Sequence, residues 1–246
     1  MEVKNRLLNY YNAWIYQNDE WFKFSLDSVL LANFVTINLS AKKIIDFATG
    51  NAPIPMLLTY RTSAKIYGIE LQKEIFELGK KSIIENRMNN QVEIINNDIK
   101  NVQNVFGCEE FDVVLCNPPY FKTDKQELLN NNEIKTLARH EITLTLEDIF
   151  ISAGKILKNK GIFAMVHRPE RFMEIINLMK KYNIEPKRIR FVYPKDGKEA
   201  NILLIEGIKN GNPGLKILSP LFVYNKNGEY NKEIKDMFGD DTHVAK

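Results

Sequence analysis

Short apolar runs alternate with longer segments of helical periodicity along most of the chain. The apolar runs are rich in β-branched and aromatic residues and predict strands over residues 43–47, 65–69, 92–95, 111–116 and 160–166. Between and after these runs, apolar residues recur at helical spacing and predict helices over residues 54–59, 72–86, 146–157 and 169–182. Parallel strands need crossover connections, so this alternation predicts a mainly parallel, doubly wound sheet with helices on both faces.

The last two predicted strands follow each other without a helix between them. Residues 188–193 and 201–206 are joined by a short segment that contains Pro, Asp and Gly, which are common in turns. This closeness predicts an antiparallel hairpin at one end of a seven-stranded, Rossmann-like α/β sheet. The residues after Gly207 should continue from the last strand across one edge of the sheet.

The chain contains no internal repeat and no low-complexity linker that would divide it. We therefore expect a single domain over residues 1–246. Its parts would be an N-terminal helical segment over 1–40, a core over 41–208 and a C-terminal extension over 209–246.

The composition is that of an ordinary globular chain. Apolar residues make up 44% and charged residues 26%, which excludes disordered and collagen-like classes. No apolar stretch approaches the roughly 18 residues of a membrane span, and the opening residues lack the apolar core of a signal peptide. We expect a cytoplasmic protein. Cys108 and Cys116 are the two cysteines, and we expect them to be ordinary thiols, with no disulfide and no metal site.

Positive charge is concentrated in one part of the chain. Residues 154–198 hold 12 Lys or Arg and 4 Asp or Glu, a balance of +8 in a chain whose net charge is +3. Such asymmetry suggests a surface for an anionic partner such as nucleic acid. A solvated helix face is the alternative that charge alone leaves open.

Candidate ligand-binding residues follow successive predicted strands, and in an open α/β sheet ligands bind beyond the carboxyl ends of the strands. The first strand ends in a small-residue turn around Gly50, which can approach a nucleoside-like ligand closely. Glu70 follows the second strand, 24 residues after Asp46, near the spacing at which an acid meets ribose hydroxyls. Asp98 follows the third strand, where a carboxylate can accept a hydrogen bond from an adenine amino group. An ordinary turn and solvated loop acids are the alternatives.

The most specific motif is Asn117-Pro118-Pro119-Tyr120, directly after the apolar run over 111–116. Two consecutive prolines restrict the backbone, so this loop can hold a rigid geometry. The Asn117 side-chain oxygen and the Pro118 carbonyl can both accept hydrogen bonds from one planar NH2 group. Tyr120 offers a face for stacking a flat base. A purely structural Asn-Pro turn is the alternative.

This motif suits an amino group whose lone pair is delocalised and weakly nucleophilic. Two acceptors favour rehybridisation and stabilise the positive charge that develops on nitrogen as it attacks an electrophilic methyl. The nitrogen, the methyl carbon and the departing sulfur must lie in line at near-attack distance. The motif therefore predicts methyl transfer to an amino group, without a metal, a strong base or a nucleophilic cysteine.

These features resemble a known family. The strand order, the turn around Gly50 and the NPPY motif look like those of the class I S-adenosylmethionine-dependent methyltransferases that act on amino groups. More closely, the chain resembles the bacterial valine tRNA adenine-N6 methyltransferases, which modify adenine 37 beside the anticodon. The resemblance runs from about Gln17 to Phe238. Besides NPPY, it is carried by residues 22–31, 138–141, 167–171 and 220–224.

The resemblance implies S-adenosylmethionine as cofactor and tRNA as substrate. Residues expected at the cofactor are Asp46, Ala48, Thr49, Gly50 and Asn51 at its methionine part, Glu70 at the ribose, Leu71, Asp98 and Ile99 at the adenine, and Asn117. Residues expected to hold the target base are Asn117, Pro118, Pro119 and Tyr120. Residues expected at the tRNA are Arg139, His140, His167, Arg168, Arg171, Arg188 and Arg190.

One departure from the family concerns Ala48 and Ala52, which stand where many relatives have glycine. An added methyl group costs little at negative φ and considerably more at positive φ. Cofactor affinity therefore depends on the backbone conformation at these two positions.

Two other functions fit parts of the sequence. A protein glutamine N5-methyltransferase would use the same motif, since an amide NH2 is also planar and weakly nucleophilic. Such enzymes generally carry an N-terminal helical substrate domain, whereas the first predicted strand begins at about Lys43, and the basic segment favours RNA. A catalytically silent RNA-binding protein would keep the fold, but the intact NPPY motif argues against it. A monomer is the favoured oligomeric state.

Overall fold

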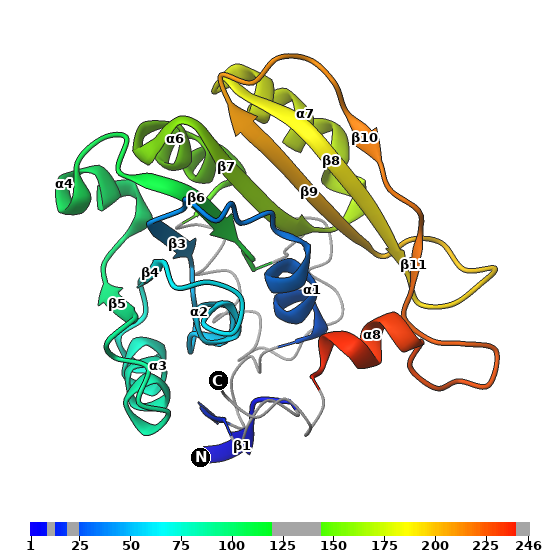
Figure 1. Cartoon of the computed structure of the whole chain (residues 1–246), viewed down its shortest axis with the longest axis horizontal. Coiled ribbons are helices and arrows are strands. Elements are labelled where there is room, and N and C mark those ends of the chain that lie inside the picture. The colour runs from blue at the N-terminus through cyan, green and yellow to red at the C-terminus, as the bar shows by residue number, and fades with distance from the viewer. Residues whose placement is uncertain (9–12, 19–24, 120–143, 240–246) are drawn as a thin grey trace, which may run out of the picture.

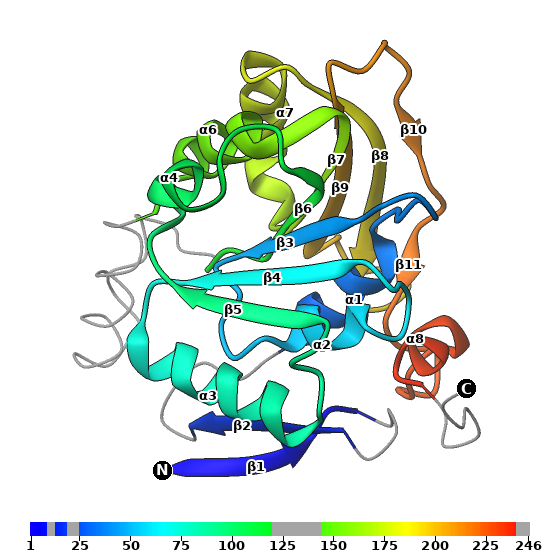
Figure 2. The same cartoon turned by 60° about the vertical axis from the view of Figure 1, so that its left-hand side comes forward.

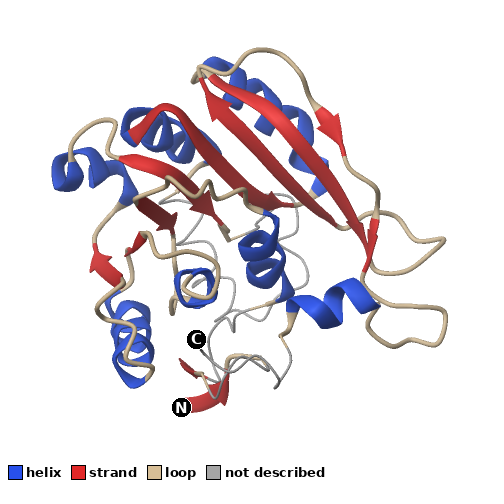
Figure 3. Ribbon diagram, in the orientation of Figure 1, coloured by secondary structure: helices blue, strands red, loops and turns tan. Residues whose placement is uncertain are grey.

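The computed structural model describes residues 1–8, 13–18, 25–119 and 144–239 (Figure 1). Its centre is a sheet with the strand order β10-β8-β9-β7-β6-β3-β4-β5, and β11 also pairs with β8 (Figure 3). The seven strands expected from the sequence are β3 (Lys43–Phe47), β4 (Lys65–Glu70), β5 (Val92–Asn96), β6 (Phe111–Cys116), β7 (Leu157–His167), β8 (Ile184–Tyr193) and β9 (Ile202–Lys209). Strands β3 to β7 pair in parallel, and β9 is antiparallel to both β7 and β8. The mostly parallel α/β sheet with a terminal antiparallel hairpin is confirmed.

The C-terminal extension adds to one edge of this sheet. Because β9 lies between β7 and β8, the outer strand of the terminal hairpin is its first strand, β8, and not its last strand, β9. Two short strands, β10 (Lys216–Ile217) and β11 (Leu221–Phe222), pair in parallel with β8. Helix α8 (Lys232–Met237) follows them. The extension therefore continues the sheet at this edge.

Strand β7 is longer than the sequence predicted, because an irregularity inside it has the composition of a turn. Its pairing with β6 shifts register between Phe111 and Val113. Lys160 has a positive φ of 64°, and a Cβ on Gly161 would lie 2.9 Å from the Lys158 carbonyl oxygen. The Lys-Gly pair marks a bulge within the strand, where the sequence indicated the strand's beginning.

Helices cover both faces of the sheet, and each face has its own apolar core (Figure 2). Helices on the first face are α1 (Leu26–Phe34), α2 (Pro53–Leu58), α3 (Lys73–Glu85) and α8. Helical elements on the second face are η1 (Ile99–Asn101), α4 (Val102–Phe106), α6 (Leu146–Ile156), η2 (Pro169–Arg171) and α7 (Phe172–Lys181). Alternate residues of β6 supply both cores: Val113 and Leu115 lie on the first face, and Val114 and Cys116 on the second. This alternation explains the continuous apolar run, because a strand covered on both faces has no solvent-facing positions.

The N-terminal segment differs from the expected helical one. It begins with an antiparallel hairpin of β1 (Glu2–Arg6) and β2 (Trp14–Asn18), which lies along α3 (Figure 2). Burial alternates along β2, with Ile15 and Gln17 buried and their neighbours partly exposed, which is the period of a strand. The first helix, α1, begins only at Leu26. The expectation of a helical segment over 1–40 is wrong for the hairpin strands.

In the parts of the chain that the structure describes, every helix is too short or too polar to cross a membrane.

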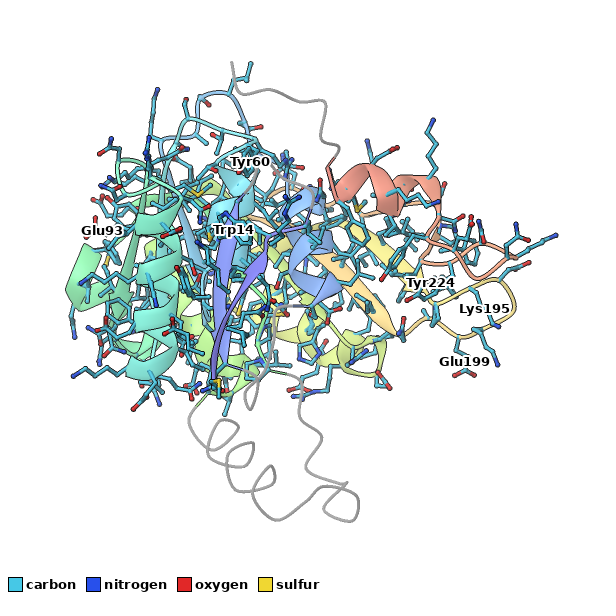
Figure 4. All side chains as sticks on the ribbon, turned by 90° about the horizontal axis from the view of Figure 1, so that it is seen from below. Trp14, Tyr60, Glu93, Lys195, Glu199 and Tyr224 are labelled. Atoms are coloured by element: carbon cyan, nitrogen blue, oxygen red, sulfur yellow. The ribbon has the colours of Figure 1, made fainter. Side chains whose placement is uncertain are left out.

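The two ends of the sheet are well separated in space. Glu93, on β5, marks one end in Figure 4, and Lys195, Glu199 and Tyr224 gather at the other, around the β8–β9 turn.

Candidate active site

The carboxyl ends of three neighbouring parallel strands bring the predicted site residues together. Phe47, the last residue of β3, is in register with Ile69 of β4 and with Cys116 of β6. The loops that follow these strands therefore start side by side at one edge of the sheet. The backbone N–H of Thr49 donates to the carbonyl of Ile69 over 3.0 Å, which fixes the first loop against the second strand.

Asp46 is a buried carboxylic acid with an unused acceptor. Its side chain is 1% exposed, and Oδ2 accepts a hydrogen bond from Thr49 Oγ1 over 2.7 Å. Oδ1 is buried and has no hydrogen-bond partner among the described residues. Burial raises the pKa of Asp46 to about 8, the Thr49 hydrogen bond opposes this rise, and the nearby charge of Glu70 adds to it. A buried polar atom without a partner destabilises the folded state, and a hydrogen-bond donor or a cation beside it would remove this cost.

The loop after β3 uses left-handed backbone conformations at three positions. The φ angles are 51° at Ala48, 60° at Gly50 and 68° at Ala52. Ala48 and Ala52 therefore both lie where a side chain is strained, by about 1 kcal/mol each. A Cβ added at Gly50 would meet nothing within 4 Å, so the side of the loop at Gly50 is open.

Glu70 ties the two loops together. It is 6% exposed, Oε2 accepts from the Gly50 N–H over 2.9 Å, and Oε1 accepts from the Gln72 N–H over 2.9 Å. Burial raises the pKa of Glu70, and the backbone hydrogen bonds limit the rise. Each carboxylate oxygen has a second lone pair, so both can still accept from hydroxyl groups. Leu71, next to it, is 45% exposed and offers an apolar surface at the same edge.

Asp98 follows β5 and caps a short 3-10 helix. Its Oδ1 accepts from the Lys100 N–H over 2.9 Å, and Lys100 Nζ lies 3.5 Å from Oδ2. The Asn97 N–H donates to the Glu70 carbonyl over 3.1 Å, which brings this loop beside the previous one. Ile99 is buried in the core of the second face. The three acids Asp46, Glu70 and Asp98 thus lie at or directly after the carboxyl ends of three neighbouring strands, β3, β4 and β5.

Asn117 stands at the end of β6, and its side chain reaches another element. Nδ2 donates to Ser28 Oγ on α1 over 3.1 Å. Pro118 is buried and Pro119 is exposed. Tyr120, Arg139 and His140 lie outside the described residues, so their predicted roles remain predictions. Ser28 belongs to the N-terminal segment of the resemblance, but sequence reasoning gave it no role.

Asn51 contacts the N-terminal hairpin. Its Nδ2 donates to the Tyr16 carbonyl over 2.8 Å, and the side chain is buried. The sequence placed Asn51 in the cofactor loop but missed the hairpin that packs against it. The loop is therefore held from two sides, by Glu70 and by β2.

His167, at the end of β7, is buried and neutral. It is 4% exposed, and Nδ1 accepts from the Arg168 N–H over 2.8 Å. Burial first, and then the charge of Arg171, lower the pKa of His167 to about 4. At neutral pH this side chain carries no charge that could attract phosphate.

The predicted tRNA arginines make hydrogen bonds within the fold. Arg168 donates to the Asn201 carbonyl over 2.9 Å, and Arg171 forms two hydrogen bonds with Glu174. On the first face, Arg188 donates to the Phe34 carbonyl over 2.6 Å and to Thr36 Oγ1 over 2.9 Å, while its Nε lies 3.6 Å from Glu206. Arg190 pairs with Glu233 of α8 and donates to the Ser219 carbonyl. Two more cations of the basic segment pair with acids outside it, Lys158 with Asp112 and Lys181 with Glu147. Acids from other parts of the chain therefore neutralise much of the +8 charge of residues 154–198.

Comparison with known proteins decides the family. Residues 23–185 match the methyltransferase small domain family. The chain belongs to this family. As a member, it is an S-adenosylmethionine-dependent methyltransferase, and the predictions of enzyme class and cofactor are confirmed.

Relatives of the family agree with the resemblance seen in the sequence. The chain is 28% identical to the tRNA1(Val) (adenine(37)-N6)-methyltransferase of Histophilus somni, over 89% of each chain. It is 24% identical to the protein of the same name in Phocaeicola vulgatus, over 78% of this chain and 79% of the relative.

Solved structures support the fold. A predicted O-methyltransferase of Agrobacterium tumefaciens matches with a TM-score of 0.70 at 21% identity, over 89% of this chain and 99% of that one. Geranyl diphosphate C-methyltransferase from Streptomyces coelicolor, in complex with S-adenosyl-L-homocysteine, matches with a TM-score of 0.56 at 12% identity, over 74% and 79%. Both likenesses show a methyltransferase fold.

Proposed function

We propose that the chain transfers a methyl group from S-adenosylmethionine to the N6 amino group of an adenine in tRNA, namely adenine 37 of a valine tRNA. The observation that carries this proposal is Asn117, which follows β6 beside the loop of Asp46 and Gly50 and has its carboxamide bonded to Ser28. A carboxamide acceptor next to a cofactor loop suits an amino-group substrate. The names of the curated relatives support tRNA and adenine 37.

The residues at the sheet edge fit the cofactor. Asp46 Oδ1 is a buried acceptor without a described partner, which suits the ammonium group of the methionine part. The open side of Gly50 leaves room for it, and Glu70, held by two backbone N–H groups, can accept from the ribose hydroxyls. Asp98 would face the adenine, with Leu71 against the ring. When bound, the cofactor supplies an electrophilic methyl group on a positively charged sulfur.

The chain's own residues orient the nucleophile. Asn117 Oδ1 and the Pro118 carbonyl oxygen each accept one hydrogen from the adenine amino group. These hydrogen bonds strengthen as positive charge develops on nitrogen, so they lower the barrier more than they strengthen binding. Methyl transfer would form a C–N bond and break the C–S bond, the electron pair of which would stay on sulfur, and the surplus proton on nitrogen would pass to water. Tyr120 would stack on the base.

Contacts with tRNA would lie around the same edge of the sheet. Arg168 and Arg171 flank this edge after β7, and Arg139 and His140 come from the segment after the NPPY motif. His167, being neutral and buried, would support these arginines without contacting phosphate itself.

The proposed function is tested with radiolabelled S-adenosylmethionine and two valine tRNA transcripts, one wild type and one with guanine at position 37. Label should enter the first transcript alone, and nuclease digestion with nucleoside mass analysis should yield N6-methyladenosine. Asn117→Ala protein serves as the control for label carried over by binding.

Three results would contradict this proposal. Label in both transcripts would contradict position 37, and label in a different nucleoside would contradict the N6 atom. Label that enters proteins of a cell extract and not its tRNA would favour the glutamine methyltransferase.

A further inference from the structure

A contact between α1 and the catalytic loop joins residues that are far apart in the sequence. Asn117 Nδ2 donates to Ser28 Oγ over 3.1 Å, across 89 positions of the chain. Ser28 is 3% exposed, so water does not compete freely for its hydroxyl. The contact is therefore a specific one between buried or partly buried groups.

The orientation of the Asn117 carboxamide decides what the loop offers a substrate. A carboxamide has an oxygen that accepts and an NH2 that donates, and the two have nearly the same shape. Rotation by 180° would present NH2 to the target amino group, and two donors would face each other. In the structure an acceptor, Ser28 Oγ, lies on the nitrogen side, and this contact holds the carboxamide in the productive orientation.

Ser28 itself is held firmly. Its backbone N–H donates to the Ser25 carbonyl over 3.2 Å within the first turn of α1. The next residues, Val29, Leu30 and Leu31, are at most 1% exposed and belong to the core of the first face. Helix α1 contacts α2, β7 and β9, so the backbone of Ser28 cannot shift without disturbing the core.

We infer that Ser28 is a positioning residue that fixes the carboxamide of Asn117 with its oxygen toward the amino group to be methylated. This inference rests on the proposed function, because it assigns Asn117 Oδ1 the role of acceptor. It also explains why an N-terminal helix, 89 positions before the NPPY motif, takes part in the chemistry.

A kinetic test uses Ser28→Ala with tRNA as substrate. The rate constant kcat should fall about tenfold, the effect of one lost hydrogen bond. The KM for tRNA and the affinity for S-adenosylmethionine should stay unchanged, because Ser28 would touch neither. Ser28→Thr keeps the hydroxyl and should restore most of the rate. Ser152→Ala, at a serine of α6 that is also 3% exposed, is the matched control and should leave kcat unchanged.

A double-mutant cycle separates positioning from a general structural effect. In an Asn117→Ala background the carboxamide is gone, so Ser28→Ala should cause no further loss of kcat. An equal loss in both backgrounds, or an unchanged kcat in Ser28→Ala alone, would overturn the inference.

A second readout is independent of the substrate. The side-chain NH2 signals of Asn117, assigned in a 15N spectrum by their loss in Asn117→Ala, should shift in Ser28→Ala and stay in place in Ser152→Ala. Unshifted signals in Ser28→Ala would overturn the inference. If wild-type protein methylates no tRNA while these signals shift, the proposed function fails and the hold of Ser28 on the carboxamide stands.

Discussion

Asp46 and Glu70 are two buried carboxylic acids that differ in their hydrogen-bond partners. The Asp46 carboxyl is almost fully buried, and one oxygen lacks a partner among the described residues. Glu70, which is nearly as buried, has two backbone N–H donors instead. Both oxygens of the Glu70 carboxylate therefore accept hydrogen bonds from the fold, whereas Asp46 Oδ1 has no donor among the described residues.

The raised pKa of Asp46 predicts how stability depends on pH. The pKa rises from 3.8 to about 8, so between these values the folded state binds the proton more tightly than the unfolded state. Asp46 then contributes stability that is fully present below about pH 4 and is lost as pH rises toward 8. Asp46→Asn should remove this contribution, so melting temperatures of the cofactor-free variant should fall less between pH 5 and pH 8 than those of wild type. Parallel curves for the two proteins would contradict the burial of an ionisable group here.

The positive φ angles at Ala48 and Ala52 allow a second prediction. Ala48 is partly exposed at φ 51°, so Ala48→Gly should raise the free energy of unfolding by about 1 kcal/mol in urea. Ala52 is fully buried in the apolar core, and its methyl contributes about 0.8 kcal/mol there, so Ala52→Gly should be nearly neutral. A destabilised Ala48→Gly variant would show that the left-handed conformation is not strained.

Titration of wild type with S-adenosylmethionine tests the silent RNA-binding alternative.

At the scale of elements, the N-terminal hairpin supports the loop after β3, which contains Gly50. Asn86, directly after α3, accepts from the Trp14 N–H over 2.8 Å and donates to the Trp14 carbonyl over 2.6 Å. Ser82 accepts from the Tyr16 N–H over 2.9 Å. The Tyr16 carbonyl of β2 in turn accepts a hydrogen bond from Asn51 in the loop after β3. The hairpin thus links the loop after β3 to α3.

Removing one support of this hairpin should loosen it without unfolding the sheet. Asn86→Ala deletes both hydrogen bonds to Trp14 and should cost about 1–3 kcal/mol of local stability. Amide hydrogen exchange of β2 should accelerate, while that of β6, which lies at the centre of the sheet, should stay as in wild type. Equal acceleration in both strands would mean that the hairpin and the sheet unfold together.

The central elements could be predicted from the sequence, and the peripheral ones could not, for a physical reason. Strands such as β6 are buried on both faces, so their apolar run is unbroken over 111–116. The hairpin strands have five residues each; β1 is mostly exposed, and the burial of β2 comes from contact with α3. The acids at the ends of β3, β4 and β5 were found because the carboxyl ends of parallel strands meet at one edge of the sheet. The Ser28 contact depends on tertiary packing across 89 positions, and no local pattern signals it.

At the scale of the whole molecule, the basic segment serves the fold as well as any partner. Arg188 links β8 to Phe34, the last residue of α1, and to Thr36, and its carboxylate neighbour Glu206 is 4% exposed. By contrast, Lys195 and Lys198 lie on an open groove at the β8–β9 turn with Glu199 and Tyr224 (Figure 4). Within the described ranges, no carboxylate lies within 4.0 Å of either lysine. The two kinds of cation should respond differently to substitution.

Arg188→Gln should lower the free energy of unfolding by about 1–3 kcal/mol, because the buried Glu206 loses its cation. Lys198→Gln, the exposed control, should leave it unchanged. If Arg188 also contacts a phosphate, the log-log slope of tRNA affinity against salt should fall by about 0.7 to 0.9. An Arg188→Gln protein as stable as wild type would contradict the structural role.

The most direct test of the account measures chemistry and binding separately at Asn117. Single-turnover methylation of a valine tRNA by wild type and by Asn117→Ala gives the rate of the chemical step, and filter binding gives the affinity for the same tRNA. The account predicts a rate about two to three orders of magnitude lower in Asn117→Ala, the typical loss of one transition-state hydrogen-bond partner, at nearly constant tRNA affinity. An Asn117→Ala protein that methylates the tRNA as fast as wild type would contradict it.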